Sequence, residues 1–211
     1  MIRVRTPGLL TLGVLASGRG SNFEALADAV AQGKLHAKIA LVISDKDNAP
    51  VLEKASAANI PSKLIMPGNF AKITDYENEI VQTLRSVNVD VVALAGYMRL
   101  IGKSFIESFP CGIVNIHPAL LPSFRGLHAP RQAIEAGVRI SGCTVHIVDE
   151  GMDTGPIIMQ AAVPISQNDD ENSLAERILV EEHLVYWQAL QLYAEGRIYI
   201  DKKNRVVIAE A

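Results

Sequence analysis

Two polar side chains, Asn115 and His117, are the residues of this chain best placed to do chemistry. They lie two positions apart in an apolar run that Pro118 ends. In an extended strand alternate side chains share a face, and Pro118 stops the strand because it has no backbone N–H. An Asn donates to a developing oxyanion, and a His moves protons near neutral pH. The pair fits acyl transfer, with a purely structural role as the alternative.

A carboxylate further along the chain is a candidate third member of this site. Asp153 lies between Gly151 and Gly155, which permit a turn that aims the side chain inward. Asp is also common in solvated turns, so only proximity to His117 gives Asp153 a chemical role. His146 alternates with apolar residues in the preceding strand, and we expect it either to pack in the core or to orient Asp153.

A Gly-rich turn at residues 17–22 joins the first expected strand to the first expected helix. Gly18 and Gly20 allow the backbone to approach a ligand closely, and Ser21 or Asn22 is expected to cap a helix whose N-terminus attracts an anion. The turn lacks the Lys-Ser/Thr pair of a Walker loop and the third Gly of the dinucleotide fingerprint. A phosphate site and a plain strand-to-helix connection are both consistent with it.

Composition narrows the class of protein. The 211 residues are 49% hydrophobic and carry a formal net charge of −3, so they can bury one core and create no general attraction for nucleic acid or an anionic membrane. Cys111 and Cys143 lie in apolar, strand-like surroundings that suit reduced thiols of a cytoplasmic protein better than a disulfide or a metal site. The apolar run within residues 1–16 is interpreted as the first core strand, at 9–16, rather than as part of a signal peptide.

Alternating apolar runs and amphipathic segments predict an α/β fold with a Rossmann-like, mostly parallel twisted sheet and helices on both faces. The expected buried strands are 9–16, 39–44, 62–66, 89–95 and 112–116, and the expected helices are 21–32, 49–58, 74–87 and 129–136. An antiparallel pair of strands at 141–148 and 157–165 follows, then a long helix at about 173–194 capped by Ser173, and a hairpin-like tail at the sheet edge. Asn115 and His117 then lie at the carboxyl end of a strand, where open α/β sheets bind ligands.

Taken together, these motifs resemble the glycinamide ribonucleotide formyltransferases of the folate-dependent formyltransferase superfamily. The resemblance covers nearly the whole chain and is carried by the turn 17–22, the Gly-Tyr-Met-Arg run 96–99, the segment 114–126 and Asp153. The Asn-x-His-Pro segment is shared across the superfamily and indicates the chemistry. The Gly-Ser-Asn turn and the short chain indicate the ribonucleotide branch.

The resemblance implies a domain organisation and a set of site residues. A single formyltransferase domain would span 1–211, with a nucleotide-binding half at about 1–110 and a folate-binding and catalytic half at about 111–211. The catalytic trio would be Asn115, His117 and Asp153, supported by His146. The ribonucleotide residues would be Gly20, Ser21, Asn22, Met98, Pro118 and Glu182. The folate residues would be Arg99, Leu100, Ile101, Val148, Asp149 and Glu150.

The implied reaction transfers the formyl group of 10-formyltetrahydrofolate, as co-substrate, to the amine of glycinamide ribonucleotide in purine biosynthesis, with no metal required. A formyltetrahydrofolate hydrolase, a formyltransferase for another amine and a non-catalytic nucleotide-binding module stay open as alternatives. We expect a cytoplasmic monomer or homodimer without nucleic-acid or membrane partners. Arg19 and Pro130 depart from the family pattern, which leaves the details of the substrate contacts open.

Overall fold

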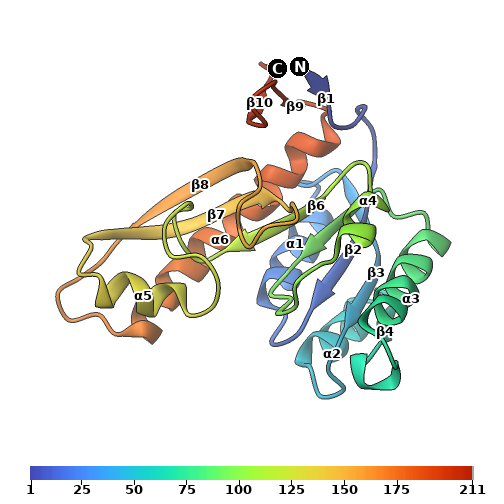
Figure 1. Cartoon of the computed structure of the whole chain (residues 1–211), viewed down its shortest axis with the longest axis horizontal. Coiled ribbons are helices and arrows are strands. Elements are labelled where there is room, and N and C mark those ends of the chain that lie inside the picture. Colours follow the sequence, from blue (N-terminus) through green and yellow to red (C-terminus); the bar gives the residue numbers. More distant parts are fainter. Residues whose placement is uncertain (211) are drawn as a thin grey trace.

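A seven-stranded sheet forms the centre of the protein in a computed structural model, which describes residues 1–210 apart from the side chain of Ile2 (Figure 1). The strands are β2 (Leu10–Ala16), β3 (Ala37–Ser44), β4 (Ser62–Leu64), β5 (Val91–Leu94), β6 (Ile113–His117), β7 (Ile140–Ile147) and β8 (Ile157–Pro164). Their spatial order is β4-β3-β2-β5-β6-β7-β8, parallel from β4 to β6, with β7 antiparallel to both β6 and β8. This confirms the predicted α/β architecture and its antiparallel element.

Helices cover both faces of this sheet. They are α1 (Ser21–Ala31), α2 (Pro50–Ala57), α3 (Ile73–Ser86), α4 (Lys103–Glu107), α5 (Ala129–Glu135) and α6 (Glu171–Ala194), with a short 3-10 helix, η1 (Pro67–Asn69). Alternation along β2 separates two cores: Val14 packs with α1, α2 and α6, whereas Leu15 packs with α3 and α4. None of the helices described is both long enough and apolar enough to span a bilayer.

The two ends of the chain meet in a second, three-stranded sheet (Figure 1). Strands β1 (Ile2–Arg3) and β10 (Val206–Ile208) both pair antiparallel with β9 (Ile198–Ile200). The core strand expected at 9–16 is confirmed as β2, and Pro7 and Gly8 separate it from β1. The tail forms a hairpin as predicted, but this hairpin does not lie at the edge of the main sheet.

The strand expected at 62–66 is shorter and more exposed than predicted. β4 covers only Ser62–Leu64, and all three residues are exposed. It pairs with β3 alone, so it is an edge strand rather than a strand buried on both faces. Edge strands are commonly short, which limits pairing with other chains.

Two helix caps also differ from prediction. α1 begins after Gly20, which adopts a left-handed conformation with φ 72°, and neither Ser21 nor Asn22 caps the helix. α6 begins after Asp170, which forms a reciprocal capping box with Ser173, three residues further along. Its carboxylate accepts from the Ser173 N–H at 2.8 Å, and its own N–H donates to the Ser173 hydroxyl at 3.0 Å. Because the reciprocal bonding places Asp170 at the N-cap and Ser173 three residues inside the helix, the helix starts before Ser173.

A β-bulge changes the register between β7 and β8 beside the polar pair. Val145 opposes Met159 and His146 opposes Ile157, so Ile158 is an extra residue on β8. On the other side of β7, His146 lies directly opposite Asn115. The antiparallel strands thus deliver a histidine next to the amide of β6.

Candidate active site

Asn115 and His117 occupy the carboxyl end of β6, as predicted. β6 ends at His117, immediately before Pro118, and the side chain of His117 is only 6% exposed. The carboxyl ends of the parallel strands β2 and β5 lie beside it, followed by the Gly-rich turn and by residues 95–102. Because these segments follow neighbouring parallel strands, they meet at one edge of the sheet.

The two ring nitrogens of His117 both face oxygen atoms. Nε2 donates to the Phe124 carbonyl at 2.9 Å, and Nδ1 lies 3.4 Å from Oδ2 of Asp153. A carbonyl can only accept, so the hydrogen is on Nε2 in the neutral ring. Burial lowers the pKa of His117, while the Phe124 carbonyl and the Asp153 carboxylate act to raise it. The ring is therefore held in one orientation with opposing influences on its charge.

Asp153 reaches His117 from the loop after β7, which gives this carboxylate the proximity that its chemical role required. It adopts a left-handed conformation with φ 52°, one that Asp tolerates better than most residues. The Gly126 N–H donates to Oδ2 at 2.8 Å. Burial acts to raise the pKa of Asp153, but His146, the Gly126 N–H and His117 outweigh it and hold the pKa below its ordinary value. Asp153 is thus ionised at neutral pH.

Gly155 allows the loop that carries Asp153 to return to the sheet. A Cβ at this position would collide with the backbone carbonyl of Ile147, so no other residue fits without a shift of the loop. Asp149 also holds the loop, because it accepts from the Gly151 N–H at 3.1 Å and from the Thr154 hydroxyl at 2.6 Å. Asp149, expected to bind folate, therefore already has partners within its own loop.

His146 lies against both Asn115 and Asp153. Its Nδ1 donates to the Ile147 carbonyl at 3.1 Å, so in the neutral ring Nε2 accepts from the Asn115 amide, also at 3.1 Å. An amide has two N–H groups, and the second one of Asn115 is available to a substrate. The same Nε2 is 3.6 Å from Oδ1 of Asp153. This geometry suits the expected supporting role, which stays a prediction.

The two segments expected to bind folate lie together. Ile101, after β5, and Val148, after β7, pack against the same hydrophobic cluster. An ion pair of 3.0 Å between Lys103 and Glu150 also links them. Leu100 between these contacts is 72% exposed, which leaves apolar surface for a ligand.

The side chain of Arg99 is held by a residue that sequence reasoning missed. Its Nε donates to Oδ2 of Asp45 at 2.7 Å, and its guanidinium lies 5.9 Å from the ring centre of Tyr76. Asp45 is buried directly after β3, and an acidic residue at the end of an apolar strand was the signal that could have revealed it. Contacts of Arg99 with folate would therefore use the backbone or the remaining N–H groups.

Four of the residues expected to bind the ribonucleotide lie at the start of α1 or on α6, two helices that pack together. Nδ2 of Asn22 on α1 donates to Oε2 of Glu182 on α6 at 2.8 Å, and both residues are buried. Burial raises the pKa of Glu182, and Oδ1 of Asn22 has no partner among the described residues. Gly20 packs so closely on Val51 that a side chain there would clash. This end of the site is compact and already hydrogen-bonded.

Met98 and Pro118 lie at the ends of the neighbouring strands. Met98 is 62% exposed, and its N–H donates to the Ser17 hydroxyl at 3.0 Å, which ties the segment after β5 to the Gly-rich turn. Pro118 is half-buried directly after His117. Met98 thus follows the strand between β2 and β6, whereas Pro118 directly follows the Asn115–His117 pair.

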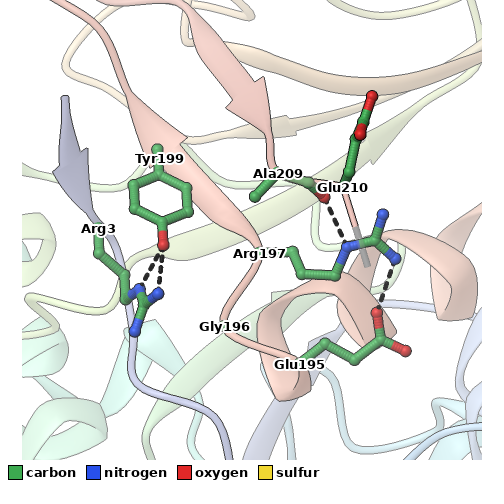
Figure 2. Close-up of a pocket in the computed structure, with 7 residues that line it drawn as sticks. All are labelled: Arg3, Glu195, Gly196, Arg197, Tyr199, Ala209 and Glu210. Atoms are coloured by element: carbon green, nitrogen blue, oxygen red, sulfur yellow. Dashed lines mark hydrogen bonds and ion pairs between the residues drawn. The ribbon is translucent and has the colours of Figure 1, made fainter.

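Two hollows lie outside the predicted contacts. One, of about 460 Å³, borders the Gly-rich turn and is lined by the exposed Arg19 together with Asp45. The other, of about 410 Å³, lies on the small sheet, where Arg3 bonds to Tyr199 and Arg197 bonds to the Ala209 carbonyl (Figure 2). None of the predicted site residues lines the second hollow, and both of its arginines have partners within the protein.

The other residues singled out in the sequence lie away from Asn115, His117 and Asp153. His128 occupies the N-cap position of α5 without capping it and contacts Glu171 at 3.1 Å. Pro130 is buried in the first turn of α5, where a missing N–H costs nothing. Cys111 lies in a turn rather than a strand, and burial raises the pKa of Cys143 to about 12. Within residues 1–210, no three His, Cys, Asp or Glu side chains gather as metal ligands would.

Comparison with known proteins agrees with the fold described above. The Formyl transferase family matches residues 11–190. Over 89% of the chain, the sequence is 48% identical to the trifunctional purine biosynthetic protein adenosine-3 of Drosophila melanogaster, of which it spans only 14%. It is 46% identical to the phosphoribosylglycinamide formyltransferase of Bacillus subtilis, covering 82% of this chain and 89% of that protein. Glycinamide ribonucleotide transformylase 1 from Symbiobacterium toebii superimposes with a TM-score of 0.94 at 44% identity, covering 96% of this chain and 95% of that structure. The chain belongs to the formyl transferase family.

Proposed function

We propose that this protein transfers the formyl group of 10-formyltetrahydrofolate to the amine of glycinamide ribonucleotide, a step of purine biosynthesis in the cytoplasm. One observation carries the proposal: Asn115, His117 and Asp153 converge at a sheet edge that also carries the Gly-rich turn. The relatives named phosphoribosylglycinamide formyltransferase support the choice of acceptor. The chain would act as a single formyltransferase domain with a nucleotide-binding half and a folate-binding half.

The reaction begins when the neutral amine nitrogen attacks the formyl carbon, so that a C–N bond forms and the carbonyl electron pair moves to oxygen. The N–H of Asn115 that does not bond to His146 would donate to that oxygen. The tetrahedral intermediate then collapses, the bond from carbon to the folate nitrogen breaks, and the proton lost by the amine is delivered to that nitrogen. Formylated ribonucleotide and tetrahydrofolate are the products.

His117 and Asp153 would supply the charge and the proton path. The ionised Asp153 favours the imidazolium form of His117 as the oxyanion develops. Both ring nitrogens already face protein oxygens, so His117 must exchange the Phe124 carbonyl or Asp153 for the reacting group or a bridging water. Asp153 would accept the amine proton through water and pass it to the leaving nitrogen.

Binding would bring the two substrates together along the sheet edge. The Gly20-Ser21-Asn22 turn would hold the phosphate at the start of α1, where backbone N–H groups attract an anion. Ile101 and Val148 would border the folate, whose flat ring system suits an apolar slot. Fixed relative positions convert a two-substrate encounter into an intramolecular one, which supplies much of the rate.

A single assay tests this proposal. Purified protein is given 10-formyltetrahydrofolate with and without glycinamide ribonucleotide, and release of tetrahydrofolate is followed by absorbance. We expect turnover only when the ribonucleotide is present, with formylated ribonucleotide formed in equal amount. Turnover without the amine would identify a hydrolase. No turnover in either mixture would point to another acceptor or to a nucleotide-binding module, and both results contradict the proposal.

A further inference from the structure

The loop between β6 and α5, residues 118–128, contacts both ionisable members of the proposed catalytic trio. Its Phe124 carbonyl accepts from His117, and its Gly126 N–H donates to Asp153. The backbone hydrogen bonds within residues 117–123 are local, linking positions two or three apart. Contacts from outside the loop therefore hold it in place. Gln132 on α5 donates to the Arg125 and Leu127 carbonyls at 3.0 and 2.9 Å, and side chains of the sheet hold residues 119–121.

A row of three side chains across the antiparallel strands provides that hold. Thr144 on β7 lies opposite His117 on β6, and Gln160 on β8 lies opposite Thr144. Directly opposed residues on neighbouring strands have their side chains on the same face. The row therefore runs from the catalytic imidazole to the edge strand β8.

Three hydrogen bonds join this row to the loop, and a fourth lies within the row. The Thr144 hydroxyl donates to the Ala119 carbonyl at 2.6 Å and accepts from the Leu121 N–H at 3.0 Å. The Gln160 amide donates to the Leu121 carbonyl at 3.0 Å and to the Thr144 hydroxyl at 2.9 Å. One donor and two acceptor sites of the hydroxyl, and both N–H groups of the amide, have partners. The network is thus saturated at these groups.

We propose that Gln160 is a positioning residue for formyl transfer, acting through Thr144 and Leu121 to hold the 118–128 loop against His117 and Asp153. Gln160 contacts neither member of that pair, and it is exposed at the end of the row. The inference rests on the proposed function for its kinetic consequence. Its structural consequence, the fixed tautomer of His117, can be measured without any turnover.

Two substitutions of Gln160 test the inference. Gln160→Met keeps the length of the side chain but removes both donors, and Gln160→Glu replaces the donors with a carboxylate of the same shape. We expect either change to lower kcat about tenfold to a hundredfold, since small displacements of catalytic groups have effects of that size, and to change KM for either substrate less than about threefold. Gln188→Met, the same change at an exposed position of α6, is the matched control.

Nitrogen NMR of the histidine rings reports the tautomer of His117. That tautomer would not change if Gln160 only stabilised the fold. In the wild type the neutral His117 ring is expected to carry its hydrogen on Nε2, whereas both Gln160 variants should show a mixture of tautomers. Thr144→Ser, which keeps the hydroxyl, should behave as wild type, and Thr144→Val, which loses it, should behave as the Gln160 variants. An unchanged His117 tautomer in both Gln160 variants would overturn the inference even if the wild type formylates no substrate. Wild-type kcat in an active enzyme carrying either Gln160 substitution would overturn it as well.

Discussion

Two carboxyl groups of the proposed site, the half-buried Asp153 and the buried Glu182, have pKa shifts of opposite direction. Asp153 lies beside two histidines and a backbone N–H, which hold its pKa below the ordinary value despite burial. Glu182 has only the neutral amide of Asn22, so burial raises its pKa. The comparison shows that burial alone does not decide the charge of a carboxyl group. The neighbours of Asp153 favour its charged form, which suits proton transfer. The surroundings of Glu182 favour its neutral form, which suits hydrogen bonding.

Removal of the charge at Asp153 should have the largest effect. Asp153→Asn keeps the size of the side chain but cannot favour the imidazolium form of His117, so we expect kcat to fall about 10³-fold, within the range for loss of a proton-transfer group. Steady-state kinetics and circular dichroism measure activity and fold. Near-wild-type turnover by the folded variant would remove Asp153 from the reaction.

Loss of the amide at Asn115 should cost less, because only one donor to the oxyanion disappears. Asn115→Ala is expected to lower kcat about 10²-fold, the lower part of the range for one such donor. The KM for the ribonucleotide should change little, since Asn115 is placed to act on the reacting oxygen rather than on the phosphate. A variant with raised KM and unchanged kcat would assign Asn115 to substrate binding instead.

At the proposed phosphate-binding end of the site, a substitution should change KM rather than kcat. Ser21→Ala removes one hydroxyl from the proposed phosphate turn, and we expect KM for glycinamide ribonucleotide to rise about tenfold, the value of one hydrogen bond to a charged group. Initial rates over a range of ribonucleotide concentration measure it, with Ser104→Ala on the exposed part of α4 as the control. Equal KM values for the two variants would contradict phosphate binding at the turn.

The smallest effect concerns stability. Because the pKa of Glu182 is raised in the folded protein, its contribution to stability is complete below the unfolded pKa and is lost as pH rises through the folded pKa. Glu182→Gln cannot ionise, so it avoids the cost of a buried charge at every pH. We expect the free energy of unfolding to increase by about 1 kcal/mol at pH 8 and by less at pH 5. Urea unfolding at both pH values checks this, and an equal change at the two would refute a raised pKa.

Asp153 provides the opposite pH dependence for the same comparison. Its lowered pKa contributes stability above the unfolded pKa, and that contribution is lost as pH falls through the folded value. Asp153→Asn should therefore be less stable than wild type at pH 7, with a difference that shrinks in acid. Glu182→Gln and Asp153→Asn thus form a pair of nearly isosteric substitutions with opposite expected pH trends.

Local pattern was enough to predict the regular part of the fold. The strand at 9–16 became β2 (Leu10–Ala16), and the shared face of Asn115 and His117 followed from alternation and from the stop at Pro118. Asp153 could be named as a candidate, but its 3.4 Å approach to His117 depends on a loop whose path no local pattern specifies. The resemblance to the family, rather than the turn alone, made that approach expected.

Other features depend on partners far apart in the chain and escaped prediction. The hydrogen bond between Arg99 and Asp45 joins the segments after β5 and β3. The hydrogen bond from Gln160 to the Leu121 carbonyl joins an edge strand to a loop. Each polar residue alone is consistent with an exposed position. The cap of α6 was misplaced for a different reason: Asp170 and Ser173 are both good caps, and their reciprocal bonding, visible only in three dimensions, selects the earlier one.

The bulge at Ile158 marks the point where β8 can lose a residue without disturbing the site. Because Ile157 opposes His146 and Met159 opposes Val145, deletion of Ile158 would leave a regular ladder in which Gln160 still opposes Thr144. A one-residue slip in the rest of the paired strand would instead turn its side chains to the opposite face of the sheet. A change of length at the bulge is therefore compatible with the row that contacts the 118–128 loop, whereas a shift of register beyond it is not.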